Sequence, residues 1–380
     1  MRVARLELTD FRNYEQLQVD FEPGINVLVG PNGQGKTNVV EAVAYLATFS
    51  SHRVATDTAL VRAGTDRAVI RSMIEHEGRS VGLDVQINPG RANRLQVNRA
   101  PVKRVRDAMG LVRAVMFAPE DLGLVKGDPS TRRRLLDQLL VQSSPRYAGV
   151  LADYEKTLRQ RNSLLRSAAK SAGRDERETL RSTLEVWDSR LVTFGADVMA
   201  GRVAVLEAIM EPTARAYASV AASRNDVGLV YVPARIQGGA RTADEFASAL
   251  REALQEVRAE EYARAVTVVG PHRDEVEMTL NGLPARGYAS HGESWSLALA
   301  LRLASYEVLR EGSSGEPVLI LDDVFAELDQ QRRACLAQFA GDTPGQVLIT
   351  AAVSGDVPDE VRGVRFSVDS GSVAAVSREK

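Results

Sequence analysis

A glycine-rich run near the N-terminus has the residue types and spacing of a phosphate-binding loop. Residues 30–37 form a complete GxxxxGK[ST] pattern. Glycines in such a loop let backbone N–H groups converge on phosphate oxygens, while the lysine reaches the β- and γ-phosphates and the hydroxyl ligates Mg²⁺. The pattern predicts a nucleotide site made of Gly30, Pro31, Asn32, Gly33, Gln34, Gly35, Lys36 and Thr37, with Thr37 on the metal.

The segments on either side of this loop have the order that phosphate binding requires. Ile25–Val29 is a short, mainly apolar run that is typical of a buried strand. After the loop, apolar residues recur at helical spacing between Thr37 and Phe49, which predicts a helix whose N-terminal dipole favours an anion. A glycine loop with a purely structural role is the alternative.

Two aspartates late in the chain are candidates for the metal and hydrolysis chemistry. Asp322 and Asp323 directly follow the apolar run Val318–Leu321. A carboxylate at the end of a buried strand beside a phosphate-binding loop is what Mg²⁺ needs. We therefore predict that Asp322 is a metal ligand with Thr37, and that Asp323 polarises the attacking water. An ordinary strand end is the alternative.

Ser290 and Gly292 lie in a short polar segment directly before the helix-favouring run Trp295–Tyr306. Small polar residues at a helix start can donate hydrogen bonds to an anion, although a plain N-cap is the alternative. The order along the chain is that of an ABC-type ATPase head. In that class the Ser-Gly segment of one subunit completes the ATP site of another, so Ser290 and Gly292 are predicted to act across a homodimer. Lys36, Asp323 and Ser290 form the predicted catalytic set.

The residue pattern changes twice along the chain, which predicts an inserted arm. Residues 1–128 alternate strand-like runs such as Val69–Ile74, Val81–Ile87 and Arg94–Val97 with turn signals. Residues 129–264 are helix-favouring and charged, and residues 265–380 contain strand and helix patterns again. We predict an α/β fold in which 1–128 and 265–380 form an ABC-type ATPase head, with a mixed P-loop sheet and an antiparallel β subdomain, and 129–264 form a mainly helical arm.

Two apolar stripes predict an antiparallel helical hairpin in the arm. The stronger stripe has the a/d spacing of a coiled-coil seam and comprises Leu180, Leu184, Trp187, Leu191, Phe194 and Val198. The weaker stripe comprises Leu151, Tyr154, Leu158 and Leu165. Lys170–Asp175 is the predicted tip, and two ordinary core-facing helices are the alternative. Thr242 and Glu245 match a capping box and predict a further helix.

Composition limits the function classes. The 380 residues contain 48 Lys and Arg against 50 Asp and Glu, so the net charge of −2 gives no whole-molecule attraction to a polyanion. A single cysteine, Cys335, excludes an intrachain disulfide and a multi-thiolate zinc site, and it fits a reducing compartment. No apolar stretch approaches the roughly 20 residues of a membrane span. We expect a cytoplasmic protein without a membrane partner.

Local basic clusters are the candidate DNA contacts. They comprise Arg91, Arg94, Arg99, Lys103, Arg104 and Arg106, followed by Arg132, Arg133 and Arg134. Clustered cations suit phosphate contacts, which carry little sequence information. A solvated strand face explains the first cluster equally well. For His272 and Arg273, buried structural pairing is the alternative to a binding role.

Over nearly its full length the chain resembles the RecF family of recombination mediators, which is related to the SMC-like ATPases. The resemblance is carried by Leu8–Glu15, Gly30–Thr37, Pro119–Leu122, Val125–Gly127, Arg132–Arg134, Gly270–Asp274, Ser290–Glu293 and Leu321–Asp329. It implies that ATP drives head dimerisation and that Arg12 belongs to the nucleotide site. It also implies that the dimer binds single-strand/double-strand DNA junctions or gaps. In the family, RecR and RecO help to load the RecA recombinase in repair and the SOS response.

Two departures from the wider ABC pattern predict weak, slow ATP hydrolysis. Asp323 stands where transporters commonly have glutamate, so its carboxylate lies one methylene farther from the nucleotide. Thr350 follows the predicted strand Val347–Ile349, where many ABC proteins have histidine. The first alternative function is the nucleotide-binding subunit of an ABC transporter, which does not account for the inserted arm. A P-loop kinase is the second, and it needs no Ser290–Glu293 signature.

Overall fold

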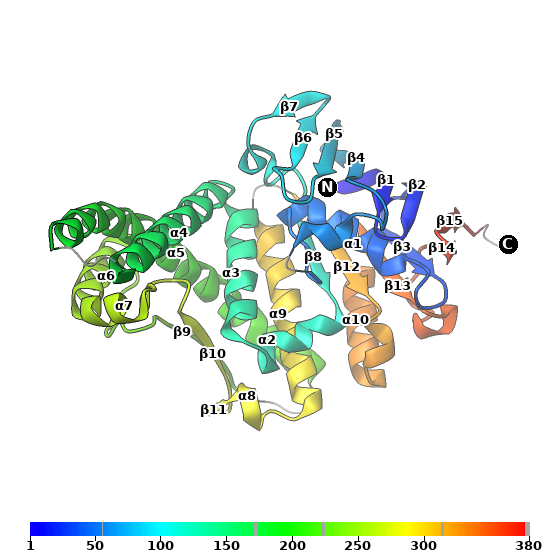
Figure 1. Cartoon of the computed structure of the whole chain (residues 1–380). Helices are drawn as coiled ribbons and strands as arrows, with labels where there is room; N and C mark the ends of the chain where they lie inside the picture. The colour runs from blue at the N-terminus through cyan, green and yellow to red at the C-terminus, as the bar shows by residue number, and fades with distance from the viewer. Residues whose placement is uncertain (55, 171–173, 222–224, 313–314, 377–380) are drawn as a thin grey trace.

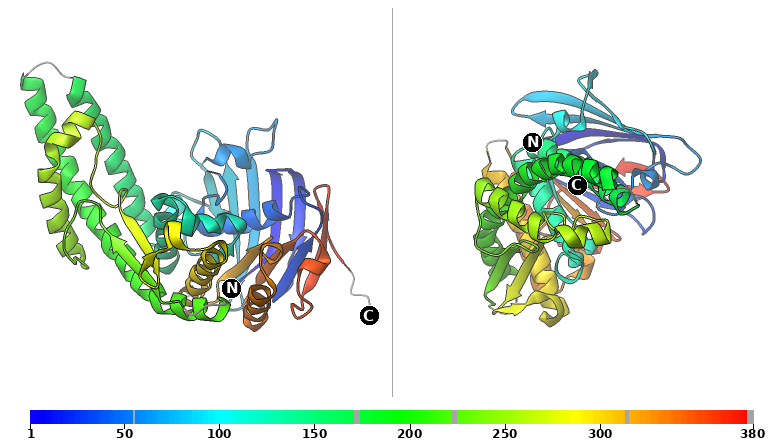
Figure 2. Two further views of the ribbon diagram at one scale, coloured as in Figure 1. Left: turned by 90° about the horizontal axis from the view of Figure 1, so that it is seen from below. Right: turned by 60° about the vertical axis from the view of Figure 1, so that its left-hand side comes forward.

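The computed structural model shows a sheet-containing head from which a long helical arm projects (Figures 1 and 2). It describes residues 1–54, 56–170, 174–221, 225–312 and 315–376. The head contains a mixed sheet and an antiparallel sheet, with helices between and behind them. This arrangement is the predicted ABC-type ATPase head with an inserted helical arm.

The mixed sheet carries the phosphate-binding loop. Its strand order is β15 (Ser372–Ala375), β14 (Val364–Asp369), β3 (Ile25–Val29), β13 (Val347–Ala351), β12 (Val318–Asp322) and β8 (Ala114–Phe117). All neighbours are parallel except β14 and β15. Both β12 and β13 are buried at every position, because helices cover one face and the second sheet covers the other. The predicted strand Ile25–Val29 is confirmed.

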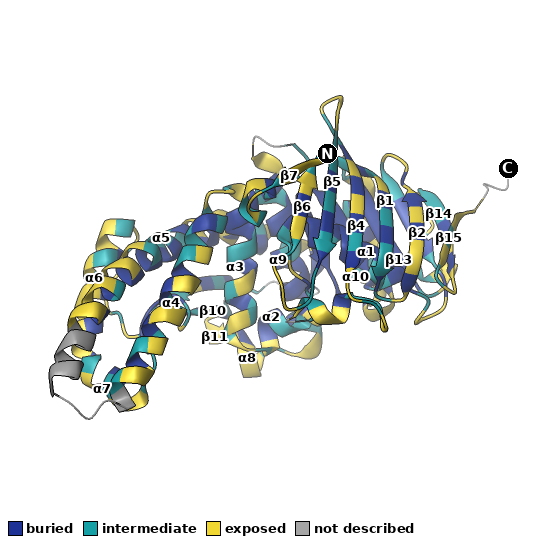
Figure 3. Ribbon diagram, turned by 45° about the horizontal axis from the view of Figure 1, so that its top comes forward, coloured by how far each residue is buried: buried dark blue, intermediate teal, exposed yellow. Residues whose placement is uncertain are grey.

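The antiparallel sheet packs on the side of the P-loop helix that faces away from the mixed sheet. Its order is β2 (Tyr14–Asp20), β1 (Arg2–Phe11), β4 (Ala68–His76), β5 (Arg79–Ile87), β6 (Arg94–Val97) and β7 (Ala100–Val102). Buried and more exposed residues alternate along β1 and β4 (Figure 3), as expected for a sheet with one face on the core. Helix α1 (Lys36–Thr48) is enclosed in the core that this sheet shares with the mixed sheet.

A second core fills the opposite face of the mixed sheet. Leu319 and Leu321 of β12 point into this core, whereas Val318 and Ile320 point toward α1, as strand alternation requires. Helix α9 (His291–Glu311) is central to it and packs on α2 (Leu122–Lys126) and α3 (Pro129–Ser143), and α10 (Gln330–Asp342) contributes to the same core.

The predicted helical hairpin is present in the arm. It consists of α4 (Tyr147–Lys170) and α5 (Arg174–Val220), which pack side by side (Figure 2). The seam residues Leu165, Leu184, Leu191 and Val198 are buried. The predicted tip and the side chain of Leu180 fall outside the described residues. Helix α5 is 47 residues long because its C-terminal half continues into the head and packs on α9.

Two shorter helices and a small sheet complete the arm side. Helices α6 (Ala243–Glu256) and α7 (Arg258–Arg264) pack beside the hairpin, and the predicted capping box of Thr242 and Glu245 is confirmed. Strands β9 (Val227–Val232), β10 (Glu275–Leu280) and β11 (Leu283–Pro284) form the small sheet, which leads to α8 (Ala285–Tyr288). The β9–β10 pairing crosses the predicted boundary at residue 264, so the division at 128 and 264 stays a prediction.

Short 3₁₀ turns connect several elements, at Asp57–Leu60, Val105–Ala108, Pro119–Asp121, Phe325–Glu327 and Ser354–Asp356. Among the helices that the structure describes, none is both long enough and apolar enough to cross a bilayer.

Candidate nucleotide site and basic surfaces

The loop between β3 and α1 is shaped by its glycines. Gly33 and Gly35 have φ values of 84° and 113°, in the region that glycine adopts without steric cost. Gly30 lies against β14: a Cβ atom there would stand 2.0 Å from the carbonyl oxygen of Val368. The loop therefore needs glycine at these positions for backbone conformation and for close packing.

Lys36 is held at the mouth of the loop. Its Nζ donates hydrogen bonds to the carbonyl oxygens of Gly30 at 2.6 Å and Pro31 at 3.0 Å. Burial lowers the pKa of Lys36, and the nearby carboxylates of Asp322 and Asp323 partly oppose that effect. The ammonium group thus lies among backbone donors and acceptors of the loop, where a phosphate oxygen is its natural ligand.

Asp322 joins the loop to the two central strands. Its Oδ1 accepts hydrogen bonds from the hydroxyl of Thr37 at 3.0 Å and from that of Thr350 at 2.6 Å. Burial raises the pKa of Asp322 to about 6, and the nearby carboxylates of Glu120 and Asp323 act in the same direction. A hydroxyl and a buried carboxylate oxygen, beside a phosphate-binding loop, form a donor set that fits Mg²⁺.

Thr350 has a structural role in this site. The register of β12 and β13 places it beside Asp322, and its Oγ1 also accepts the backbone N–H of Asp323 at 2.9 Å. Asp323 has a φ of 53°, an uncommon left-handed conformation that turns the chain sharply after β12. Thr350 therefore fixes the buried aspartate and the backbone of the predicted hydrolytic residue together.

Asn13 and Tyr14 of the N-terminal Leu8–Glu15 motif contact the phosphate-binding loop from outside. Asn13 donates to the carbonyl oxygen of Gln34 and accepts from the side chain of Asn38. Gly35 faces Tyr14, whose hydroxyl would lie 2.5 Å from an added Cβ atom. At the far side, the side chain of Gln34 accepts the backbone N–H of Ser370. These contacts join β2, the loop and the β14–β15 turn.

Arg12, which the resemblance assigns to the nucleotide site, forms a bidentate pair with Glu41 of α1, at 2.9 and 2.6 Å. Glu41 is completely buried and also accepts from Ser51. Sequence reasoning missed Glu41, because a single acidic residue on a predicted helix carries no signal of its burial. In this structure Arg12 anchors α1 to the antiparallel sheet, and its predicted nucleotide contact remains a prediction.

Ser290 is the N-cap of α9 and lies apart from the loop. Its hydroxyl accepts the N–H of Glu293, whose carboxylate accepts the N–H of Ser290 in return. Gly292 faces Arg332 of α10, with 3.0 Å between an added Cβ atom and the guanidinium. Figure 1 shows α9 starting beside α8, away from the loop that precedes α1. One chain therefore does not bring Ser290 and Lys36 together.

Comparison with known proteins identifies the family. Residues 2–368 match the sequence family described as the RecF/RecN/SMC N terminal domain. The protein called DNA replication and repair protein RecF from Streptomyces avermitilis is 50% identical over 99% of this chain and 100% of its own length. The protein of the same name from Frankia alni is 51% identical over the same shares. The chain belongs to the RecF family.

Solved structures agree with this membership. A RecF structure described as "recombination mediator protein RecF-ATP in RecFOR pathway" superposes with a TM-score of 0.89 at 26% identity, covering 99% of this chain and 97% of that one. The Smc head domain of Pyrococcus furiosus, at 15% identity and a TM-score of 0.53, supports the fold alone. Membership in the RecF family sets aside the transporter subunit and the P-loop kinase as alternatives.

The predicted DNA-binding cations of this RecF-family chain fall into two groups. Five are exposed on the antiparallel sheet and the turn after it, and none forms an ion pair with a described residue: Arg91, Arg94, Arg99, Lys103 and Arg104. Arg132 is different, because it is 4% exposed and pairs with both carboxylate oxygens of Glu275. The prediction that Arg132 contacts DNA is wrong, since this buried pair leaves no surface for a phosphate. Arg133 is half-buried and donates to the carbonyl oxygen of Asp274.

The Gly270–Asp274 motif forms a polar network where the arm joins the head. His272 accepts from or donates to the hydroxyl of Tyr154 at 2.7 Å, and burial lowers the pKa of His272 to about 4. Burial also raises the pKa of Asp274 to about 6, although Tyr231 and the N–H of Ala234 donate to it. His272 thus makes structural contacts, in agreement with the alternative of buried pairing. Arg273 is exposed and donates to the carbonyl oxygen of Thr267, so that alternative does not describe Arg273.

Proposed function

We propose that this chain is an ATP-dependent DNA-binding protein of replication and repair. The P-loop geometry, with Lys36 among loop carbonyls and Thr37 hydrogen-bonded to Asp322, supports ATP as the ligand. Thr37 and Asp322 would hold Mg²⁺, which when bound neutralises charge on the β- and γ-phosphates. The RecF structure that superposes on this chain carries ATP in its description, which supports the same ligand here.

The separation of Ser290 from the P-loop carries the proposal. An exposed N-cap with its capping box complete offers a helix N-terminus to an anion, but its own P-loop lies elsewhere. A second copy of the chain can bring its Ser290 and Gly292 to the γ-phosphate of the first. ATP would then join two heads in a symmetric dimer, because each copy supplies both halves.

Hydrolysis in this dimer is proposed to be slow. Asp323 would polarise the attacking water through a short side chain, and its backbone is fixed by Thr350. No described group on β13 replaces the histidine of other ABC ATPases, because Thr350 directs its hydroxyl to Asp322. The ATP-bound dimer would therefore persist and act as a switch.

We propose that the dimer binds DNA at single-strand/double-strand junctions or gaps. The unpaired cations Arg91, Arg94, Arg99, Lys103 and Arg104 support phosphate contacts on the head. RecR and RecO are proposed partners, since the superposing RecF structure is described as part of the RecFOR pathway, and RecA loading would follow. We propose a cytoplasmic site of action. The proposed units are the head, residues 1–128 and 265–380, and the arm, residues 129–264.

Sedimentation with and without ATP tests the dimer. We expect wild type to form ATP-dependent dimers and Lys36→Arg to lose them with ATP binding. Ser290→Arg should bind ATP as a monomer but fail to dimerise, because a large cation blocks the partner's nucleotide. Ser290→Thr is the control, since threonine also caps helices and fits the same place. ATP-dependent dimers of Ser290→Arg would contradict the proposal.

A further inference from the structure

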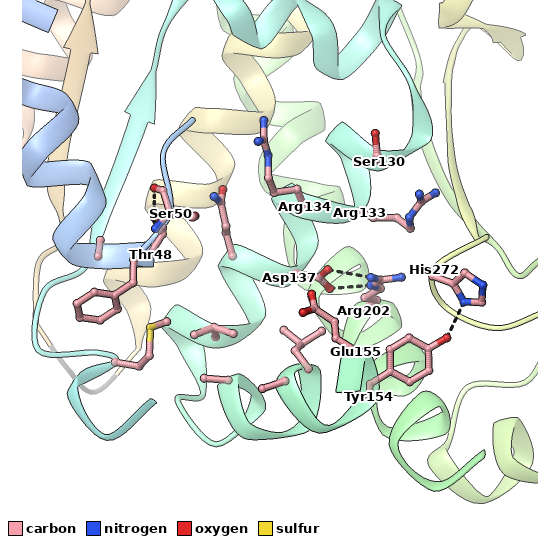
Figure 4. Close-up of a pocket in the computed structure, with 18 of the residues that line it drawn as sticks. Thr48, Ser50, Ser130, Arg133, Arg134, Asp137, Tyr154, Glu155, Arg202 and His272 are labelled. Carbon is pink, nitrogen blue, oxygen red and sulfur yellow. Dashed lines mark hydrogen bonds and ion pairs between the residues drawn. The ribbon is translucent and has the colours of Figure 1, made fainter. Parts of the chain in front are cut away.

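Two cavities meet where the P-loop helix ends. The arm-side pocket, about 640 Å³, lies between the end of α1 and helices α3, α4 and α5 (Figure 4). The sheet-side pocket, about 670 Å³, lies between the same helix end and the turns around β6 and β7. Phe49 and Ser50 line both cavities, which therefore adjoin at these two residues; we refer to the two adjoining cavities as the hollow. Each volume is in the range that accommodates a nucleotide-sized ligand.

Positive charge lines the hollow on both sides of Phe49. Arg91 and Lys103 line the sheet-side pocket, and Arg133 and Arg134 line the arm-side pocket. Among the described residues, none of these four cations has a carboxylate partner within ion-pair distance. Arg133 makes one hydrogen bond, to the backbone carbonyl oxygen of Asp274, and the carboxylates that act on its charge lie beyond ion-pair distance. The two basic clusters of the sequence are thus brought to one surface feature.

The carboxylates of the hollow are already engaged. Asp137 receives two hydrogen bonds of 2.8 Å from the buried guanidinium of Arg202 (Figure 4). Asp57 accepts from Tyr45 and Asn93 on the sheet side. Glu155 lies 3.6 Å from Arg159 of its own helix. Cations therefore outnumber carboxylates in the lining of the hollow, and this balance favours an anion such as a phosphate.

Phe49 is placed as an aromatic platform. It ends α1 with a φ of 47°, a left-handed conformation that is uncommon for an aromatic residue, and one part of its side chain packs against the core around α1. The ring is half-buried and packs edge to face on Tyr45, with centroids 6.4 Å apart. Proteins that bind single strands combine a basic groove with aromatic rings on which bases stack. A duplex must first be unstacked before a base can contact such a ring, at a cost of a few kcal/mol per step, whereas a single strand offers unstacked bases directly.

We propose that a single strand of DNA runs through this hollow, with a base stacked on Phe49 and phosphates against Arg91, Lys103 and Arg134. The inference rests on the proposed function and names the strand and its contacts. Phe49 ends the helix that Lys36 begins, and 13 residues of α-helix span about 20 Å. The nucleotide and the DNA strand would thus bind to opposite ends of one rigid element.

Fluorescence anisotropy with a labelled 20-nucleotide oligo-dT tests the stacking contact. The full chain with ATP and Mg²⁺ is used, and a 20-base-pair duplex is measured in parallel. Phe49→Ala should weaken oligo-dT binding about tenfold, the order expected for one stacked base. Phe49→Tyr should restore it, while Phe49→Leu, which keeps apolar volume against Tyr45, should still bind weakly. Circular dichroism confirms that each variant is folded.

Salt titration tests the phosphate contacts. Each lost contact should reduce the slope of log K against log[salt] by about 0.7 for a single strand. We expect this change for Arg91→Gln and for Arg134→Gln. The matched control is Arg251→Gln, because Arg251 is exposed on α6 without an ion pair among described residues. Its slope should equal that of wild type.

Two results would overturn the inference. One is that Phe49→Ala and Phe49→Leu bind oligo-dT with the same affinity as wild type. The other is an equal loss of oligo-dT and duplex binding, since that would mean a duplex contact or a damaged surface. If wild type also forms no ATP-dependent dimer and binds no DNA, the proposed function fails as well. If wild type dimerises and binds DNA while these variants are unaffected, only the single-strand path fails.

Discussion

At the scale of single residues, the candidate site depends on a buried carboxylate that accepts hydrogen bonds from two hydroxyl groups. Asp322 receives these two bonds, and its raised pKa shows that burial outweighs them. A divalent cation bound by Asp322 and Thr37 would offset the cost of burying this charge. The neighbouring Asp323 is half-buried and has a left-handed backbone conformation, so the two aspartates differ in burial and backbone geometry, as the separate roles proposed for them require.

Replacing Asp323 with Asn tests its proposed role. The amide keeps the size of the side chain but cannot accept a proton, so we expect ATP hydrolysis to fall about 100-fold or more. ATP affinity should stay within about twofold, and the lifetime of the ATP dimer should increase. Phosphate release and dimer dissociation after dilution measure these effects. Hydrolysis and dimer lifetime equal to wild type would remove Asp323 from the reaction.

His272 makes the stability of the arm junction depend on pH. Its folded-state pKa of about 4 lies below the ordinary value near 6.5, so the neutral ring is favoured in the folded chain. The resulting stability is complete above pH 6.5 and is lost as the pH falls toward 4. Asp274 acts in the opposite direction, because its folded-state pKa is raised to about 6.

Comparison with His272→Gln isolates the histidine contribution. Between pH 7 and pH 5, the free energy of unfolding of wild type should fall by about 2 kcal/mol relative to the variant. Urea unfolding at the two pH values gives this difference. Glutamine can still exchange hydrogen bonds with Tyr154 and with the carbonyl oxygen of Thr267, so it keeps the polar contacts. If the difference in unfolding free energy between wild type and His272→Gln does not change with pH, His272 is not buried in its neutral form.

At the scale of elements, the arm is held together by a buried ionic cluster as well as by its apolar seam. Arg161 of α4 is fully buried and binds Asp188 of α5 at 2.7 Å and Glu261 of α7 at 2.5 Å. It also donates to Thr267, which precedes the Gly270–Asp274 motif. One guanidinium thus sets the position of both hairpin helices and of the segment that returns to the head.

Arg161→Met should destabilise the arm strongly. Methionine fills much of the space but leaves Glu261 buried without its cation, which costs about 3–5 kcal/mol. Arg159→Met is the matched control on the same helix, because its ion pair with Glu155 is exposed and is worth about 0.5 kcal/mol or less. Urea unfolding and hydrogen exchange of α4 and α7 measure both. Equal stability of the two variants would show that the buried cluster does not hold the arm.

At the scale of the whole molecule, a net charge of −2 coexists with unpaired cations on the head. The proposed attraction to DNA would therefore be local, and the proposed dimer would present two copies of each basic cluster on one assembly. This arrangement predicts weak DNA binding by the monomer and stronger binding by the ATP-bound dimer, without any change in the charge of either chain.

The salt dependence of DNA binding should change with ATP. If the dimer doubles the number of phosphate contacts, the slope of log K against log[salt] should become about twice as steep in the presence of ATP. Ser290→Arg should keep the shallow slope with or without ATP, because it stays monomeric. Anisotropy on gapped DNA over a salt series measures both. If the slope for wild type is the same with and without ATP, DNA binding does not depend on ATP-driven dimerisation.

Much of the head could be predicted from local patterns. The alternation of β1 and β4, the apolar runs of β3 and β12, the helix after the P-loop and the capping box at Thr242 all depend on residues near one another in the chain. Backbone geometry and periodic burial act over a few residues, so the sequence carries them directly. The same holds for the P-loop itself, whose glycines serve local conformations.

Only the tertiary structure decided which distant groups meet. It places Arg132 in a buried ion pair with Glu275 and pairs Arg12 with Glu41, which the sequence pattern does not single out. It also places the hydroxyl of Thr350 on the carboxylate of Asp322. It also joined two basic clusters through Phe49. The sequence by itself determined the family and the helical arm, and it predicted the nucleotide chemistry. It could not determine these contacts, because strand register and helix packing bring together residues whose spacing along the chain carries no periodic signal.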